Sequence, residues 1–391
     1  MTKVSPYAKE ESQYQISSKA SNVERKLISH VPDLVVYDKN SSKIPHVHKF
    51  DGVLLFADVS GFTALTERYT TSSAKGTDAL TVTLNNYIGK IVQSILCAGG
   101  DVLKFAGDAI LAVWKVKKRS DLAHAISQAA KCSLFIQEKC DNQETDVGVK
   151  LRVKIAISAG KVFVTFVGNE NCRHFVMAGR PVREVNAAEK YCRAGLVVLS
   201  PNAMELSERD NIVAEILSER FGLVKYLRRE PRKDWKEYVD MPEASEFVDT
   251  EESKSFRVTL EIRPKVEREK TIRKYVAPVV QRKLDDEHPL KYLSEMRQCS
   301  VVFLNLAFDL NERDKFFHEK QCENMQAAFN IVYSNVLDRQ GSLNKIFMFD
   351  KGCTFLVIFG LPGDKHDQET AHALQAAWII SQVRFYLVWL V

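Results

Sequence analysis

The eight cysteines of this 391-residue sequence include no Cys-x-x-Cys pair and follow no regular spacing. A disulfide framework and a structural zinc site both need such a pattern, so the sequence argues against these two kinds of site. Scattered cysteines without partners are typical of a reducing compartment. We therefore expect the protein in the cytoplasm, with the nucleus and the membrane periphery as alternatives.

Long apolar runs and a strong charge of one sign are also lacking. The first 21 residues are polar and mixed, unlike a secretory signal. No stretch reaches the ~20 uninterrupted apolar residues of a membrane-spanning helix, since even residues 371–391 contain Gln375, Gln382 and Arg384. The net charge of +5 is small and forms no basic stripe. We expect neither an integral membrane span nor a nucleic-acid partner.

The stretch that organises the rest of the chain is F-A-D-V-S-G-F-T, residues 56–63. The apolar run before it, residues 53–56, lies between Asp51-Gly52 and Ser60-Gly61 and predicts a buried strand that ends in a turn. Asp58 stands at the end of this strand. The turn after it has backbone N–H groups free to face an anion.

A second stretch, residues 99–114, predicts a hairpin with Gly107-Asp108 at its tight turn. Asp58 and Asp108 could then share a pair of Mg²⁺ ions, because magnesium takes one or two carboxylates together with substrate phosphates. A metal pair stabilises both the attacking and the leaving oxygens of an in-line displacement. The alternative is that both residues are ordinary turn and cap residues, for which Asp is also favoured.

The two stretches, F-A-D-V-S-G-F-T and L-K-F-A-G-D-A, resemble the catalytic domain of the class III nucleotidyl cyclases. Residues 51–56, 131–134, 199–202 and 347–353 are similar to segments of the soluble, bicarbonate-responsive adenylyl cyclases. The resemblance runs from about residue 31 to about residue 381. It implies an adenylyl cyclase that converts ATP to 3′,5′-cyclic AMP and pyrophosphate by two-metal catalysis, at the interface of two cyclase domains.

The resemblance also implies roles for individual residues. Asp58, Asp108 and the carbonyl of Val59 would bind two Mg²⁺ ions, with Mn²⁺ as a substitute. The backbone of Ser60, Gly61, Phe62 and Thr63 would cradle the triphosphate of ATP. Lys154 would reach a phosphate and Lys345 would read the adenine ring, which favours ATP over GTP. Without the family, both lysines are more simply interpreted as surface residues.

An activating bicarbonate ion would, by the same resemblance, lie in a pocket formed by Lys104, Met177, Asn186 and Met348. Asn186 stands where the family has an arginine. An amide brings no charge, and charge-assisted hydrogen bonds are about twice as strong as neutral ones, so we expect a weakened bicarbonate response. Arg183, three residues earlier on the same predicted helix, is a possible substitute.

The order of elements favours an α+β fold, a class III cyclase-type, ferredoxin-like sheet with packed helices. After an N-terminal segment, residues 1–45, we expect a complete first cyclase domain over residues 46–226. Its strands 151–158 and 161–167 are expected to be separated by a turn at Ala159-Gly160. Residues 34–37 are expected to form an early strand or a cover segment, and residues 46–48 a polar loop.

Residues 227–295 are dense in charge and predict a linker. The first pattern then returns in residues 296–391, an internal repeat that predicts a partial, truncated second cyclase domain. This second copy has Asn305 in the place of Asp58, and Asp350 lies off register from the second metal carboxylate. Its last residues, 384–391, do not resemble the family, so the expected Asn and Arg that stabilise the transition state are missing.

Two alternatives follow from these departures. The chain could be a catalytically impaired, truncated isoform that binds nucleotide or a partner cyclase domain. Asn186 and Lys190 have the spacing of the missing Asn and Arg, so two first domains from separate chains could also complete each other's sites. A third interpretation, a guanylyl cyclase or another nucleotide-binding module, depends on whether Lys345 reads adenine.

Overall fold

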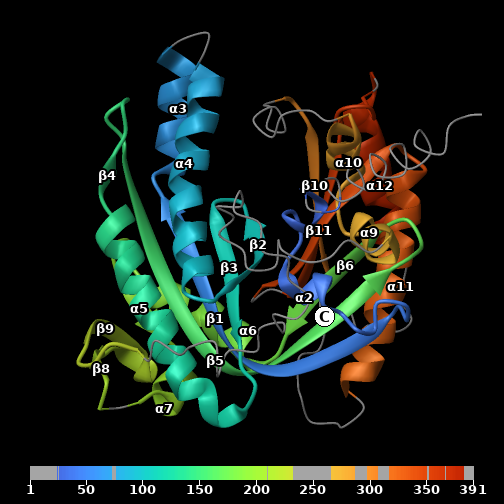
Figure 1. Cartoon of the computed structure of the whole chain (residues 1–391). Coiled ribbons are helices and arrows are strands. Elements are labelled where there is room, and N and C mark those ends of the chain that lie inside the picture. Colours follow the sequence, from blue (N-terminus) through green and yellow to red (C-terminus); the bar gives the residue numbers. More distant parts are fainter. Residues whose placement is uncertain are drawn as a thin grey trace, which may run out of the picture.

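The computed structural model of the chain describes residues 24, 26–72, 76–208, 210–231, 266–286, 297–306, 317–349, 352–365 and 367–382. These residues form a large mixed sheet, a smaller three-stranded sheet, and helices against both (Figure 1). The fold is therefore of the α+β kind expected from the sequence. Asp350, the tail 384–391 and much of the linker fall outside the described residues.

The large sheet has the strand order β2-β3-β1-β5-β7-β9-β8, and β4 and β6 also pair with β5. At the centre of this sheet, β1 and β5 pair in antiparallel fashion along the whole length of β1. The strands are β1 (His46–Ser60), β2 (Asp101–Ala106), β3 (Ala109–Lys115), β4 (Gln143–Glu144), β5 (Lys150–Gly168), β6 (Arg173–Ala178), β7 (Val197–Leu199), β8 (Ile212–Ile216) and β9 (Gly222–Leu227).

Both faces of this sheet are covered. Val53 and Leu55 of β1 pack in a core with α4 (Gly76–Cys97) and α5 (Leu122–Cys140). Leu54, on the opposite face, packs in a second core with α2 (Asp33–Val36), α9 (Val266–Arg273) and α10 (Pro278–Asp285). A strand buried on both faces is apolar without alternation, which accounts for the continuous run in β1. The remaining helices of this part are α3 (Phe62–Ser72), α6 (Arg180–Tyr191) and α7 (Pro201–Leu206), with the 3₁₀ turns η1 (Arg119–Asp121) and η2 (Ser218–Arg220).

The small sheet repeats the start of the large one. Its order is β10-β12-β11, the same as β1-β3-β2, with β10 (Ser300–Leu306), β11 (Gly341–Phe349) and β12 (Gly352–Phe359). The helices α11 (Phe317–Leu337) and α12 (Glu369–Gln382) take the places of α4 and α5. Both hairpins have a register shift just before a lysine, Lys104 in β2 and Lys345 in β11. The internal repeat expected from the sequence is confirmed for these elements.

The two copies contact each other directly. The ends of β5 and β6 extend toward α11 and β11 (Figure 1). Gln326 of α11 donates a hydrogen bond to the carbonyl of Gly168 and accepts one from its N–H, at 2.8 and 2.9 Å. The second copy is therefore packed against the sheet of the first.

Two local expectations were wrong. Residues 150–168 form one strand, because the pairing with β1 continues through Ala159 and Gly160 and no turn can form there. The same pairing draws His46–His48 into β1 instead of leaving a loop. Residues 33–36 are a short helix, because the N–H groups of Asp33 and Leu34 donate to the carboxylate of Asp101 at 3.1 and 3.2 Å. Of the two alternatives for residues 34–37, only the early strand was wrong, because Val35 and Val36 pack in the second core and so cover the sheet.

None of the described helices is long and apolar enough to cross a membrane.

Candidate active site

Asp58 and Asp108 come together because two strands pair in register. Asp58, near the end of β1, pairs with Ala109, and Asp108 is the turn residue immediately before Ala109. Partial burial and the charge of Asp58 raise the pKa of the Asp108 carboxyl above its usual range. Two carboxylates are therefore held close enough to repel each other, an arrangement that a bound cation would relieve.

Lys154 joins Asp58 and Asp108 from β5, the second strand that pairs with β1. Its position in β5 pairs with Asp58, and its Nζ lies 3.0 Å from Asp58 Oδ2. The same Nζ also donates to Glu189, which reaches it from α6. The hydrogen bonds and charges of the two carboxylates raise the pKa of Lys154, against a loss of solvation that lowers it. Lys154 is thus a positioned cation shared by two acids.

Sequence reasoning missed Glu189. The residue lies on a helix expected from the sequence, but nothing in the chain indicated that this helix would face β5. The only local signal was that Glu189 directly precedes Lys190, a residue that the sequence analysis had singled out together with Asn186. Tertiary packing alone decides that Glu189 meets Lys154.

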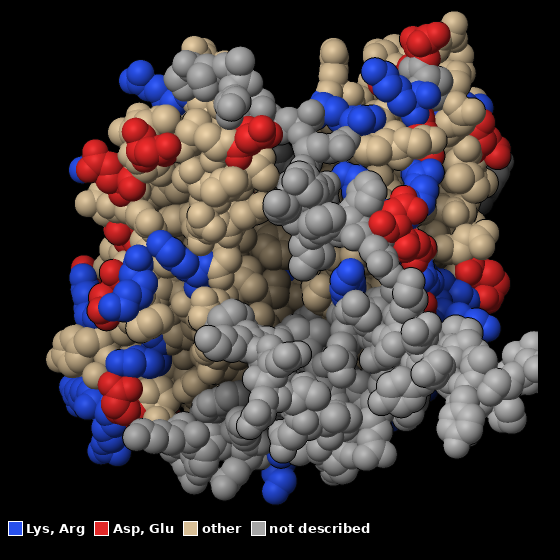
Figure 2. Space-filling view, turned by 45° about the horizontal axis from the view of Figure 1, so that its top comes forward, with Lys and Arg blue, Asp and Glu red and all other residues tan. Residues whose placement is uncertain are grey.

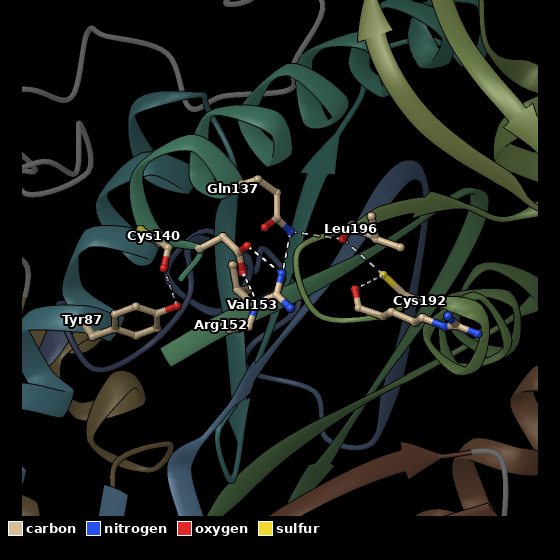
Figure 3. A network of polar contacts seen from close by, with 9 residues as sticks. Tyr87, Gln137, Cys140, Arg152, Val153, Cys192 and Leu196 are labelled. Carbon is tan, nitrogen blue, oxygen red and sulfur yellow. Dashed lines mark hydrogen bonds and ion pairs between the residues drawn. The ribbon is translucent and has the colours of Figure 1, made fainter. Parts of the chain in front are cut away.

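A polar network that includes Gln137, Val153 and Cys192 joins α5, β5 and the end of α6 (Figure 3). Gln137 of α5 donates to the carbonyls of Val153 at 2.9 Å and of Leu196 at 3.1 Å. The thiol of Cys192, at the end of α6, donates to the carbonyl of Leu196 at 3.2 Å (Figure 3). Because Val153 precedes Lys154 and Cys192 follows Glu189 by one turn, this network positions both members of the ion pair.

The predicted phosphate cradle lies at the junction of β1 and α3. Gly61 has φ +102°, and a Cβ there would lie 2.7 Å from the carbonyl oxygen of Lys150. Only glycine, which has no Cβ and readily adopts a positive φ, fits this position without strain. Immediately after it, Phe62 begins α3, whose first-turn N–H groups have no partner within the helix. Val59 and Ser60 are the last residues of β1, so the cradle directly follows Asp58.

Lys345 reaches the same region from the second copy. Its Nζ donates to the carbonyl of Phe105 in β2 at 2.9 Å. Phe105 lies three residues before Asp108, so Lys345 contacts the strand that leads into the turn of Asp108. Burial lowers the pKa of the Lys345 amine. Figure 2 shows the surface hollowed between the first-copy helices α3 and α4 and the second copy.

Lys104, Met177, Asn186 and Met348 surround one cavity of about 40 Å³. Apolar side chains of both copies also line it, namely Phe56, Ala106, Leu111, Val182, Val185 and Phe347. Asn186 Nδ2 is buried and has no hydrogen-bond partner among the described residues. Nζ of Lys104 donates to the carbonyls of Phe175 and Ile346, and burial lowers its pKa to about 7. Arg183 is exposed and does not line this cavity, so it is not placed to replace the missing arginine.

The second copy lacks an equivalent pair of carboxylates among its described residues. Its register places Asn305 opposite Thr354, as Asp58 is placed opposite Ala109. Cys353 then occupies the position of Asp108, and it is buried against Met325. Neither side chain supplies a carboxylate.

Asp58 and Asp108 of the first copy fit a pair of Mg²⁺ ions whose remaining ligands come from water and the substrate phosphates. No group of three or more His, Cys, Asp or Glu side chains is arranged to hold a metal within the part of the chain that the structure describes. Asp58 and Asp108 offer two mutually repelling carboxylates beside the free N–H groups of α3. This donor set suits a hard cation that takes its remaining ligands from water and phosphate.

Comparison with known proteins bears on the identity of the chain. Residues 47–221 match the family described as the adenylate and guanylate cyclase catalytic domain. Adenylate cyclase type 10 of Rattus norvegicus is 39% identical over 357 residues, 90% of this chain and 22% of the relative. The Homo sapiens protein of the same name is 37% identical, with the same shares covered. The chain thus spans about a fifth of the length of the curated relatives it matches.

Solved cyclase structures are also similar to part of the chain. The guanylyl cyclase domain of the RhoGC fusion protein from Blastocladiella emersonii is 19% identical, with a TM-score of 0.39, and the match covers 48% of this chain and 100% of that one. The family match includes Asp58, Asp108, Lys154 and Glu189. Residues 47–221 therefore form a cyclase domain of the class III nucleotidyl cyclase family, within a chain of which 90% is related to adenylate cyclase type 10.

Proposed function

We propose that this chain is an adenylyl cyclase that converts ATP to 3′,5′-cyclic AMP and pyrophosphate, with the nucleotide held between the two copies. The observation that carries the proposal is the convergence of Asp58, Asp108 and Lys154 from three neighbouring segments. The sequence relationship to adenylate cyclase type 10 supports ATP as the substrate.

Two Mg²⁺ or Mn²⁺ ions held by Asp58, Asp108 and the Val59 carbonyl would lower the pKa of the 3′-hydroxyl and neutralise charge on the phosphates. The chain's own residues then position the substrate. The N–H groups at the start of α3 bind phosphate oxygens, because that end of a helix favours negative charge. Lys154 exchanges its contact with Asp58 for a phosphate oxygen while Glu189 keeps the amine in place.

Lys345 is proposed to read the base. It donates to the carbonyl oxygen of Phe105, and adenine N1, a ring nitrogen, can also accept a hydrogen bond from an amine. Guanine carries a proton at N1 and offers no acceptor there. Exchange of the Phe105 carbonyl for adenine N1 would therefore select ATP over GTP.

The cavity around Asn186 is proposed to take bicarbonate weakly. Asn186 Nδ2 is a buried donor without a partner, and Lys104 supplies a positive charge when it is protonated. The cavity of about 40 Å³ suits an ion of a few atoms. Because the amide carries no charge, the anion would be held less strongly than by an arginine.

A catalytically impaired form that still binds nucleotide is the second candidate. The specific observation in its favour is that the described part of the second copy supplies neutral residues, Asn305 and Cys353, at the metal positions. The alternative pairing of two first domains meets an obstacle, because Phe347 and Met348 of the second copy cover Asn186.

Cyclic AMP formation by the purified chain with Mn²⁺-ATP, beside an Asp108→Asn variant, tests the proposal. We expect product from the unaltered chain and a loss of at least ~10²-fold in the variant. Mn²⁺-ATP binding, measured by calorimetry on both proteins, separates the candidates. Binding of Mn²⁺-ATP without formation of cyclic AMP identifies the catalytically impaired form. If the chain neither binds Mn²⁺-ATP nor forms cyclic AMP, both candidate functions are refuted.

A further inference from the structure

A second, larger cavity lies where three parts of the chain meet. Its volume is about 450 Å³, a size typical of sites for small organic molecules. Residues 171–174, at the start of β6, border it from the first copy, and residues 274–278, between α9 and α10, border it from the linker. The end of α11 and the start of β11 border it from the second copy (Figure 1). It shares no lining residue with the cavity around Asn186.

The charged lining of this cavity is mainly positive. Three cations line it, namely Arg173, Lys274 and Lys365. The one acid among the described residues that line it, Asp364, forms an ion pair with Arg282 at 3.6 Å. The lining therefore carries a surplus of positive charge, which attracts an anion.

Arg173 is the most deeply buried of these cations. Only 5% of this residue is exposed, and its guanidinium donates to the backbone carbonyls of Asn169 and Ser41. Within the described part of the chain, Arg173 forms no ion pair with a carboxylate. Buried charges in proteins are normally paired, so the position of Arg173 favours a ligand that brings the negative charge.

The start of α10 adds to the positive field. This helix begins at Pro278, and its N-cap residue Ala277 makes no side-chain cap. Both residues line the cavity. The N-terminal end of a helix carries a partial positive charge and favours anions. His174, which also lines the cavity, brings no charge at neutral pH, because burial lowers its pKa to about 3.

Much of the remaining lining is apolar. It includes Tyr275, Val276, Tyr333, Val336, Leu337 and Leu343. Aromatic and aliphatic side chains with a few convergent polar groups are typical of sites for organic molecules. A small inorganic ion would leave most of this apolar surface uncovered, so the lining favours an organic anion.

We propose that this cavity binds a small organic anion with an apolar body, of the class of aromatic carboxylates and sulfonates. The anionic group lies near Arg173, Lys274 and the start of α10, and the apolar body packs against Tyr333 and Leu343. Because the lining comes from both copies and from the linker, the bound anion holds these three parts together. The proposal concerns binding alone and does not depend on whether the chain forms cyclic AMP.

Calorimetric titration of the full chain with 1-naphthalenesulfonate tests the proposal, beside the neutral analogue 1-naphthalenesulfonamide. We expect one sulfonate to bind per chain, at least ~tenfold more tightly than the sulfonamide, because charge-assisted hydrogen bonds are the stronger ones. Saturating Mn²⁺-ATP should leave the sulfonate bound. The absence of binding, equal affinity for the two compounds, or displacement by Mn²⁺-ATP overturns the proposal.

Two matched variants locate the bound sulfonate. Lys274→Met and Glu170→Gln both remove the ion pair between Lys274 and Glu170, but only Lys274 lines the cavity. The Glu170 side chain is 88% exposed, so the loss of this pair costs little stability and both variants should fold. Lys274→Met should weaken sulfonate binding at least ~fivefold, whereas Glu170→Gln should not weaken it. Unchanged affinity in Lys274→Met, or an equal loss in both variants, overturns the proposal.

Discussion

Lys104 and Lys345 each donate a hydrogen bond to the backbone carbonyl of the residue that follows the other. Lys104 donates to Ile346 and Lys345 to Phe105, the latter at 2.9 Å. The two lysines occupy the same position of the repeated hairpin, immediately after the register shift. The reciprocal contacts relate the two copies by an approximate twofold axis that passes between β2 and β11.

The low pKa of Lys104 makes stability depend on pH. Burial lowers this pKa from 10.5 to about 7, so between these values the folded chain binds fewer protons than the unfolded chain. The free energy of unfolding should therefore rise with pH in this window, by at most about 1.4 kcal/mol per pH unit. Below pH 7 the penalty is present in full and constant.

Urea unfolding at pH 7 and pH 9 checks this dependence in the unaltered chain and in Lys104→Met. The variant should show a smaller rise between the two pH values. Lys161→Met, at an exposed position of β5, is the control and should keep the rise of the unaltered chain. Identical rises in the unaltered chain and in Lys104→Met would contradict the role of Lys104.

Replacement of Asp108 by Asn should preserve the fold while it removes turnover. The charge of Asp58 raises the pKa of Asp108, so the ionised carboxylate of Asp108 opposes folding at neutral pH. The thermal midpoint of Asp108→Asn should thus be equal to or above that of the unaltered chain without metal. Scanning calorimetry measures it, with Asp338→Asn on the surface as control. A clear fall in the midpoint would show that Asp108 has a structural role.

Lys154→Met should change the affinities for metal and for nucleotide in opposite directions. Lys154 competes with a cation for Asp58, from which its Nζ lies 3.0 Å. Without the amine, Mn²⁺ should bind the nucleotide-free protein severalfold more tightly, because a nearby positive charge is gone. ATP should bind more weakly. Calorimetric titrations with Mn²⁺ and with Mn²⁺-ATP, beside Lys161→Met, measure both effects, and a parallel loss of both affinities would be inconsistent with this competition.

Asn186→Arg should strengthen the response to bicarbonate. The change supplies a charged donor at the cavity lined by Lys104 and Met348, where Asn186 Nδ2 has no partner among the described residues. Cyclic AMP formation with bicarbonate or chloride at fixed pH and ionic strength measures the response. Arg183→Ala, at an exposed position, should leave it unchanged. Strong stimulation of the unaltered chain would refute the weak-binding prediction.

Gly61→Ala should destabilise the chain, whereas Gly89→Ala should not. The added Cβ at Gly61 meets the Lys150 carbonyl at 2.7 Å, and φ is +102°. Such strain costs about 1–3 kcal/mol. A Cβ at Gly89, within α4, meets nothing within 4 Å and should add up to ~1 kcal/mol of stability. Urea unfolding compares the two variants, and equal changes would argue against strain at Gly61.

Local patterns predicted the hairpin with Asp108 and the buried strand that carries Asp58, because turn chemistry and apolar runs act within a few residues. They did not predict that β5 continues past Gly160, because that continuity depends on a pairing with β1. Residues 34–37 were equally unpredictable, because the carboxylate of Asp101 holds their helix from 67 residues away.

By itself, the sequence determined the repeat, its order of elements and the pair Asp58 and Asp108, because motif and repeat are properties of residue order. Only the tertiary structure decided that Glu189 shares Lys154 with Asp58 and that Asn186 lines a small cavity between the two copies. These relationships join segments from different elements, and the packing of helices and strands, not local preference, brings such segments together.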